Sequence, residues 1–423
     1  MPAANKPINE EGRLAALRQY DILDSVEEAE YNDIVKLASA ICDMPVSTVT
    51  LIDEDRQWYK AKVGIDIEGT PRNIAFCAHT ILDPGNPLVI EDMTKDDRMS
   101  DNPFVTGELH AAQFYAGFPL KDDNGFVLGT LCVLDMQPRT LTQIQTEALS
   151  VLANNVMNLI NLRKKTSDLT ALYEEMKNEI DRAALLQRQM LPSLKHIDNV
   201  KKAYNIDIAG LFKPCTELAG DLWGVRAISD TSYAIYMIDF TGHGVSAAIN
   251  TFSIHNMMNE DGMFGLEPHH FLAKLNDKLK NSLQIGQFAT MFYGVVDTQF
   301  EEMVYAAAST TQTILVTKDR TVLLEQKGLP LGVMAGSKYN KHKVPFEKDA
   351  LMFFYSDALI ETKSSSGQTL DISLIQKTLE DNARDNCEEI MSKIMTQFNR
   401  FNIKEKVDDD LTIVVLKNDK SSS

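Results

Sequence analysis

One stretch organises the C-terminal half of the chain: Ser232-Tyr-Ala-Ile-Tyr-Met-Ile-Asp-Phe-Thr-Gly-His-Gly-Val-Ser-Ala-Ala248. Its first part is apolar at both alternating positions, which is typical of a strand buried on both faces. Asp239 follows this run at once, and Gly242 and Gly244 allow a tight backbone turn into a following helix. The sequence therefore predicts a buried strand with a carboxylate at its end.

Two further apolar runs have aspartate at one end. Asp357 lies just after the run 350–355, and the aspartates 408–410 immediately precede the run 411–416. Asp221 lies between glycines, in Leu218-Ala-Gly-Asp-Leu-Trp-Gly224. One such aspartate is commonly a turn or cap residue, but several converging carboxylates repel one another unless divalent cations meet them. Ligands that are all oxygen favour Mg²⁺ or Mn²⁺ over zinc.

These segments resemble, in order, the motifs of the metal-dependent protein phosphatase (PPM) family, in its SpoIIE-type branch. The matching blocks are Ala219-Gly-Asp221, Asp239-Phe-Thr-Gly-His-Gly-Val-Ser-Ala-Ala248, Gly328-Leu-Pro-Leu-Gly-Val333, Phe354-Tyr-Ser-Asp-Ala-Leu-Ile-Glu361 and Asp409-Asp-Leu-Thr-Ile413. The resemblance implies an α-β-β-α sandwich over residues 196–423. It also implies hydrolysis of phosphoserine or phosphothreonine.

The resemblance assigns the metal ligands residue by residue. Asp239 is expected to bridge two Mn²⁺ or Mg²⁺ ions. Asp221 completes the shell on the same side, where the carbonyl of Phe240 can bind one ion directly. Asp357 and Asp409 are expected to hold the other ion.

The expected reaction is direct attack by a water that the two ions activate. A covalent phospho-enzyme is not needed, so Cys215 is not required as a nucleophile. His243 either donates a proton to the leaving oxygen or makes a structural hydrogen bond in the glycine-rich turn. Asp410 is the less favoured ligand of the final aspartate pair, although the sequence does not separate these neighbours.

Three departures from the family pattern bear on activity. Ala219 and Ala358 replace glycines, which puts the local backbone in doubt if those positions need a positive φ. The family's Ala-Gly-His-x-Pro segment is replaced by Ala308-Ser-Thr-Thr-Gln312. These changes remove no metal ligand, so we expect activity, with altered specificity or a need for an activator.

The first 160 residues have the pattern of a mixed α/β unit. Helical spacing comes first, and β-like runs follow at 46–52, 57–63, 88–90 and 115–120. Asp123-Asn-Gly125 then predicts a hairpin turn before the apolar run that starts at Phe126.

Several stretches of residues 1–160 resemble a GAF domain, which implies an antiparallel sheet flanked by helices. They are Asp55-Arg-Gln-Trp-Tyr-Lys-Ala61, Phe76-Cys-Ala-His-Thr-Ile81, Asp101-Asn-Pro-Phe-Val105, Phe114-Tyr-Ala-Gly-Phe-Pro-Leu120 and Gly129-Thr-Leu-Cys-Val-Leu-Asp135. Many such domains bind a small ligand on one sheet face, although the domain can also be purely a dimerisation module. The ligand here is unknown, and the cyclic-nucleotide and bilin patterns are not evident. Cys77 and His79 make at most half a metal or haem site, so we expect them to pack within the domain.

Residues 161–195 are predicted to form a helical coiled-coil linker. Leu162, Leu169 and Met176 recur every seven residues, and Leu172 stands at the d spacing. The seam is imperfect, because Lys165 and Glu179 break the d series. We expect a parallel homodimer through this linker and the GAF domain. The alternative is a single helix that packs on its own phosphatase domain. In the family, this helix is the expected route for a sensor's signal.

Composition excludes some classes of partner. The formal net charge of −18 disfavours nucleic acid and anionic membranes. Five scattered cysteines without a CxxC pair indicate free thiols in a reducing compartment. No apolar run is long enough to span a bilayer, and the N-terminus lacks a signal-peptide pattern, so a cytoplasmic location is expected.

Three hypotheses follow for function. The first is a signal-regulated phosphatase, whose substrate, by resemblance, is a STAS-type anti-sigma-factor antagonist. The second is a catalytically silent pseudo-phosphatase that acts as a ligand-responsive scaffold. The third is a metal-dependent hydrolase of small phosphoesters or cyclic nucleotides.

Overall fold

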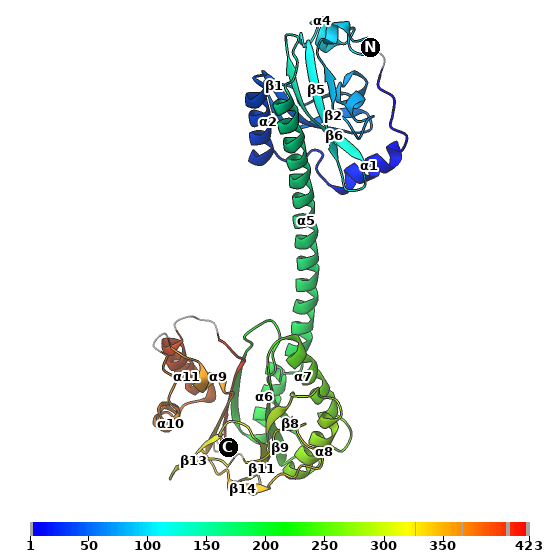
Figure 1. The fold of residues 1–423 in the computed structure, drawn as a ribbon. Coiled ribbons are helices and arrows are strands. Elements are labelled where there is room, and N and C mark those ends of the chain that lie inside the picture. Colours follow the sequence, from blue (N-terminus) through cyan, green and yellow to red (C-terminus); the bar gives the residue numbers. More distant parts are fainter. Residues whose placement is uncertain (1–2, 326, 365–366, 403–406, 420–423) are drawn as a thin grey trace. The chain divides into compact units, whose positions relative to one another are not determined.

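The computed structural model describes residues 3–325, 327–364, 367–402 and 407–419. The chain divides into two compact units, Met1–Glu174 and Glu175–Ser423 (Figure 1). Both units combine antiparallel sheets with helices, so the predicted α+β class is confirmed. Among the described helices, none has the length and apolarity needed to cross a membrane.

The first unit is built on one six-stranded antiparallel sheet with the strand order β3-β2-β1-β6-β5-β4. The strands are β1 (Val46–Ile52), β2 (Arg56–Val63), β3 (Gly69–Pro71), β4 (Leu88–Ile90), β5 (Phe114–Lys121) and β6 (Val127–Asp135). The predicted hairpin joins β5 to β6. Asp122 Oδ1 accepts the N–H groups of Asn124 and Phe126, and Gly125 has a φ of 87°.

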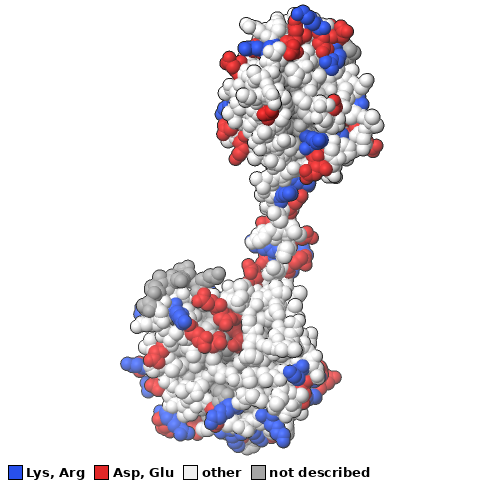
Figure 2. Space-filling view, viewed as in Figure 1, with Lys and Arg blue, Asp and Glu red and all other residues white. Residues whose placement is uncertain are grey.

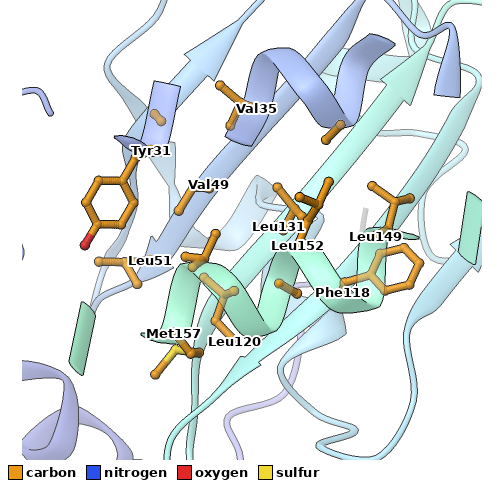
Figure 3. Packing of buried hydrophobic residues seen from close by; sticks show 14 of the residues in the cluster. Tyr31, Val35, Val49, Leu51, Phe118, Leu120, Leu131, Leu149, Leu152 and Met157 are labelled. Atoms are coloured by element: carbon orange, nitrogen blue, oxygen red, sulfur yellow. The ribbon is translucent and has the colours of Figure 1, made fainter. Parts of the chain in front are cut away.

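Helices cover both faces of this sheet. Three of them, α1 (Glu10–Gln19), α2 (Ala29–Cys42) and the start of α5 (Gln143–Arg188), pack on one face. Figure 3 shows this core, in which Val35 of α2 and Leu152 of α5 lie over Leu131 of the sheet. The other face carries the short elements η1 (Arg72–Ile74), α3 (Cys77–Thr80), η2 (Met93–Lys95) and α4 (Pro103–Thr106).

The second unit contains two five-stranded antiparallel sheets, with the orders β14-β11-β10-β9-β8 and β13-β12-β15-β16-β7. The strands of the first sheet are β8 (Leu222–Ala227), β9 (Ser232–Phe240), β10 (Ala289–Asp297), β11 (Glu302–Ala308) and β14 (His342–Pro345). Those of the second are β7 (Asp207–Lys213), β12 (Ile314–Val316), β13 (Thr321–Leu323), β15 (Leu351–Tyr355) and β16 (Leu411–Lys417).

The two sheets pack face to face between two layers of helices. Helices α7 (Val245–Met258) and α8 (Pro268–Lys280) cover the first sheet, and α10 (Ile372–Asp381) and α11 (Cys387–Phe401) cover the second (Figure 1). The remaining helices are α6 (Leu194–Tyr204) and α9 (Ala358–Glu361). The predicted α-β-β-α sandwich is therefore confirmed. Its separate cores explain why β15 and β16 are buried at every position.

Helix α5 runs without interruption from Gln143 to Arg188, so the segment after Asn161 is helical as predicted. One side of the helix between Leu149 and Ile160 is buried in the core of the first unit. Ala184 and Gln187, near its end, are buried in the second unit. In between, four apolar side chains are 53–67% exposed: Leu162, Leu169, Leu172 and Met176.

Candidate active site

Four strand ends place the predicted aspartates together. Asp221 directly precedes β8, and Asp239 is the next-to-last residue of β9 in the same sheet. In the second sheet, Asp357 lies two residues after β15, and Asp409 lies two residues before β16. The start of β8 lies beside the end of β9, and the start of β16 lies beside the end of β15, because both strand pairs are antiparallel. All four residues are therefore at the same end of the sandwich.

A side-chain hydrogen bond joins the two sheets at this end. Asp221 is only 1% exposed, and its Oδ2 accepts a hydrogen bond of 2.5 Å from Thr412 Oγ1 of β16. Thr412 is itself aligned by Ser356, whose Oγ accepts the Thr412 N–H at 2.8 Å and donates to the Asp410 carbonyl. The sequence motifs contained Thr412 and Ser356 but did not indicate this role.

The aspartates raise one another's pKa values. Burial raises the pKa of Asp221 well above its usual range, and the charge of Asp239 adds to the effect. Burial also raises the pKa of Asp239 to about 7, together with the charges of Asp357 and Asp409. The pKa of Asp357 is raised by burial and by Asp409. In the described part of the chain, no Lys or Arg forms an ion pair with any of the four. This is the electrostatic pattern of a site that lacks a counter-charge.

Asp409 and Asp410 differ in surroundings although they are adjacent. Asp410 is buried, and its two carboxylate oxygens accept the backbone N–H groups of Cys215 (2.8 Å) and Gly220 (2.6 Å). Asp409 is exposed, and its Oδ1 accepts the N–H of Asp410. Asp410 thus holds the Gly220–Asp221 segment in place, whereas Asp409 keeps an oxygen available.

The backbone around the site resolves two of the departures noted in the sequence. Neither Ala219 nor Ala358 has a positive φ, so neither alanine strains the chain. Ser309, which stands at the glycine of the family's Ala-Gly-His-x-Pro segment, does adopt a φ of 54°. Gly242 and Gly244 have φ values of 84° and 79°, as the predicted turn requires.

Gly220 lies where a side chain would not fit. A Cβ atom there would be 3.0 Å from the carbonyl oxygens of both Phe240 and Gly242. The carbonyl of Phe240, a predicted metal ligand, is therefore directed toward the segment that carries Asp221. Phe240 itself is buried, and its N–H donates to the Gly220 carbonyl at 3.3 Å.

His243 and Cys215 lie at the edge of the site. His243 is exposed, and among the described residues its ring makes no hydrogen bond, so a structural role in the turn has no support. Burial raises the pKa of Cys215 to about 12, helped by the charge of Asp410, so the thiol is protonated at neutral pH. Ligand atoms of Cys215, Asp409 and Asp410 all lie within 4.8 Å of one another.

An acidic cleft opens at the aspartates of the second sheet. Its volume is ≈ 310 Å³, and its lining includes Asp357, Glu361, Lys363, Asp408 and Asp409. Figure 2 shows acidic side chains gathered on this unit. The first unit has a larger hollow, of ≈ 940 Å³ along β2, but charges at its rim are paired, as in Arg56–Asp24 and Lys60–Glu28.

Gln187, near the end of α5, contacts the site from behind and was not singled out from the sequence. Its side chain is 2% exposed. Its Nε2 donates to the Ala219 carbonyl (2.7 Å) and to Thr251 Oγ1 of α7 (2.8 Å), and its Oε1 accepts the Ala219 N–H (3.0 Å). The amide is thus fully used in fixing the residue two positions before Asp221.

Comparison with known proteins found a family model that matches part of each unit. Residues 229–419 match the family model for stage II sporulation protein E (SpoIIE), and residues 27–160 match that for the GAF domain. The PP2C domain of SiaA from Pseudomonas aeruginosa has a TM-score of 0.52 and 19% identity, over 58% of this chain and 98% of that domain. This likeness confirms the PP2C fold.

Two curated relatives cover the chain to different extents. The cyclic di-GMP phosphodiesterase PA2567 of Pseudomonas aeruginosa is 35% identical over 186 residues, which are 43% of this chain but only 31% of that protein. The phosphoserine phosphatase RsbU of Bacillus subtilis is 26% identical over 252 residues, which are 59% of this chain and 72% of that protein.

Proposed function

We propose that this chain, which joins a GAF domain to a SpoIIE-type domain, is a metal-dependent phosphatase of proteins phosphorylated on serine or threonine. The observation that carries the proposal is the convergence of Asp221, Asp239, Asp357 and Asp409 from four strand ends, with raised pKa values for the first three. Such a cluster is costly to bury unless cations neutralise it.

The donor set fits Mn²⁺ or Mg²⁺, which prefer oxygen ligands. The charges of Asp357 and Asp409 raise the pKa of Asp239, which also interacts with Asp221 of its own sheet. Asp239 would therefore be placed to share its carboxylate between two ions. Asp221 and the Phe240 carbonyl would help to hold the ions from the first sheet, and Asp357 and Asp409 would hold them from the second.

When bound, two divalent cations supply a water of lowered pKa and neutralise charge on the phosphoryl oxygens. The chain's own residues do the positioning: Thr412 orients Asp221, and Asp410 holds the loop before it. His243, exposed just after Phe240, is our candidate for protonating the leaving serine or threonine oxygen. Burial raises the pKa of the Cys215 thiol, which disfavours Cys215 as the nucleophile of a covalent phospho-enzyme.

The names of two relatives support the proposed substrate class. RsbU, which matches 59% of this chain, and RsbP of Bacillus subtilis are both named phosphoserine phosphatases. We propose a phosphorylated STAS-type anti-sigma-factor antagonist as the substrate, as the SpoIIE-type resemblance implies. The alternative of a silent pseudo-phosphatase is favoured by the altered segment 308–312, in which Ser309 has a φ of 54°, whereas Ala219 and Ala358 introduce no positive φ.

Helix α5 is proposed to regulate the site and to form a homodimer. Its exposed side chains Leu162, Leu169, Leu172 and Met176 lie on the a and d positions of one heptad seam. Its last turns pack on Leu218 and Ala248, which flank the segments carrying Asp221 and Asp239. Any change in the pairing or rotation of α5 would therefore reach both segments directly.

The decisive experiment measures Mn²⁺-dependent release of phosphate from a phosphoserine STAS-domain protein and a phosphoserine peptide. An aryl phosphomonoester and a cyclic dinucleotide are tested beside them. Wild type is compared with Asp239→Asn, and Asp230→Asn, an exposed aspartate in the turn before β9, is the matched control. We expect Mn²⁺-dependent activity on the phosphoproteins that Asp239→Asn abolishes and Asp230→Asn leaves intact.

The other outcomes discriminate the alternatives. Turnover of the cyclic dinucleotide alone would replace the protein phosphatase with a small-phosphoester hydrolase. No turnover of any substrate, with Mn²⁺ binding absent, would establish the pseudo-phosphatase. No turnover with Mn²⁺ bound would indicate that the GAF domain must first receive its ligand or partner.

A further inference from the structure

Two cysteines far apart in sequence meet inside the first unit. Cys77 begins α3 and Cys132 lies in β6, and their Sγ atoms are 3.9 Å apart. Both side chains are 2% exposed. Among the described residues, no other pair of thiols comes within contact distance. Closing the gap to the S–S bond length requires an approach of about 2 Å, which is within reach of a side-chain rotation and a small shift of the four-residue helix α3.

Hydroxyl groups surround the two thiols. The Tyr115 hydroxyl donates to Cys77 Sγ at 3.4 Å and shares a 2.7 Å hydrogen bond with Thr80. Thr48 Oγ1 lies 3.0 Å from Cys132 Sγ. All these groups are buried. An apolar core that only packed two thiols would not need this polar environment.

The thiol pair also borders a small cavity with a polar lining. The cavity has a volume of ≈ 30 Å³, and both cysteines line it together with Gln57, Tyr59 and Thr70. Gln57 and Thr70 are more than nine-tenths buried, and both interact with the Tyr59 hydroxyl. The space suits one or two water-sized molecules, which these side chains can bind. Ile65, only partly buried, lies at its rim.

We propose that Cys77 and Cys132 form a peroxide-oxidisable dithiol site, in which hydrogen peroxide admitted to the cavity converts the pair into a disulfide. The Cys77 thiolate attacks one peroxide oxygen, the O–O bond breaks, and the other oxygen leaves as hydroxide and takes up a proton. The Cys132 thiol then attacks the sulfenic sulfur of Cys77 and forms the S–S bond. The sulfenic hydroxyl departs with the Cys132 proton as a second water, so one peroxide is reduced as two thiols are oxidised.

The surroundings divide the roles between the two thiols. Burial acts to raise the pKa of Cys77, but hydrogen bonds from Cys132 and neighbouring hydroxyls outweigh it and lower that pKa. The hydrogen bond to Cys77 raises the pKa of Cys132, and burial adds to this. Cys77 is therefore the attacking thiolate and Cys132 the resolving thiol. Elsewhere, burial raises the pKa of Cys42 to about 11, which makes it a poor nucleophile.

The test treats the full-length, reduced protein with hydrogen peroxide, then alkylates the remaining thiols after denaturation and maps the peptides by mass spectrometry. We expect two of the five thiols to become protected, a mass decrease of about 2 Da before alkylation, and one linked peptide pair that contains Cys77 and Cys132. Cumene hydroperoxide should react at least about tenfold more slowly, because it does not fit a cavity of water-molecule size.

Two variants separate the steps. Cys132→Ser should halt the reaction at a Cys77 sulfenic acid that dimedone traps, whereas Cys42→Ser, the matched control, should leave the disulfide unchanged. The proposal is overturned if wild type keeps Cys77 and Cys132 reduced at a peroxide dose that oxidises the partly exposed Cys215. It is also overturned if the linked peptides join other cysteines. Neither readout depends on phosphatase activity.

Discussion

In the first unit, the carboxylate of Glu10 lies between the guanidinium groups of Arg13 and Arg72, whereas in the second unit the charged neighbours of Asp221 and Asp239 are other carboxylates. Burial acts to raise the pKa of Glu10, but the hydrogen bonds of the two arginines outweigh it and lower that pKa to about 2. Deeper burial raises the pKa of Asp239 to about 7, together with the charges of Asp357 and Asp409.

The difference teaches how to separate a structural buried charge from a functional one. A paired charge stabilises the fold that surrounds it, as Glu10 does. A set of like charges destabilises its fold until a ligand of opposite charge binds, so its presence points to that ligand. Four variants or conditions test this contrast.

The largest effect is expected from Asp221→Asn. Removing one buried carboxylate should reduce hydrolysis of a phosphoserine peptide by about a thousandfold, because a metal ligand is lost. In metal-free buffer the same variant should unfold at a higher temperature than wild type, because repulsion with Asp239 is relieved. A phosphate-release assay checks the expected loss of hydrolysis, and calorimetry checks the expected rise in unfolding temperature. A variant that is inactive and also less stable without metal would break the comparison.

The pH dependence of stability should have opposite signs in the two units. The folded-state pKa of Asp239, about 7, exceeds its unfolded value of about 3.9, so the folded state binds more protons between these limits. Metal-free stability of the SpoIIE-type domain should therefore fall as pH rises through this window, by about 2–4 kcal/mol.

For Glu10 the sign is reversed. Its folded pKa is lowered, so its stabilising contribution is present above the unfolded pKa and is lost as pH falls from about 4 toward 2. Calorimetric scans of the full chain from pH 4 to pH 8, with and without Mn²⁺, measure the change in stability expected from Asp239. Mn²⁺ should cancel the decline. A metal-free SpoIIE-type domain that becomes more stable as pH rises would contradict the assignment.

Breaking the paired charge should be a purely structural defect. Glu10→Gln leaves Arg13 and Arg72 without their shared carboxylate and should destabilise the first unit by about 2 kcal/mol. Glu11→Gln, an exposed neighbour on the same helix, is the matched control and should change stability little. Mn²⁺ affinity should be the same in both variants. A change in metal binding would show that the two kinds of charge are not independent.

The smallest effect concerns the support behind the site. Gln187→Leu removes both hydrogen bonds to the backbone of Ala219 and should weaken Mn²⁺ binding by about tenfold, as loss of an outer-shell partner does. Gln189→Leu, an exposed change two residues later, is the control. Isothermal titration calorimetry measures both. Equal Mn²⁺ affinities of Gln187→Leu and Gln189→Leu would show that Gln187 does not help to position Asp221.

Sequence patterns predicted the elements and the convergence of the aspartates, because periodicity and strand-end position are local features. The buried runs became β9, β15 and β16, and Asp239 and Asp357 came to one end of the sandwich. The contacts of Gln187 with Ala219 and of Thr412 with Asp221 were not predicted. Their partners are separated in the sequence by 32 and 191 positions, respectively. No local pattern indicates such pairings.

The first unit gives the same lesson. Its hairpin turn at 123–125 was predicted from a local dipeptide signal, and β1 and β4 were found at the expected residues. The approach of Cys77 to Cys132, 55 residues apart, depends on α3 lying over β6, which spacing along the chain does not indicate. In the second unit, the different surroundings of Asp409 and Asp410 could likewise not be predicted, because they depend on where the fold places the Gly220 N–H.

The most direct test of the central claim is a calorimetric titration of Mn²⁺ into the metal-free full chain at pH 6, in two buffers of different ionisation enthalpy. The account predicts two bound ions per chain and the release of at least about one proton, because carboxylates with raised pKa values must ionise to bind metal. It predicts that Asp239→Asn loses most of this binding. No saturable binding, or binding without proton release that Asp239→Asn leaves unchanged, would contradict it.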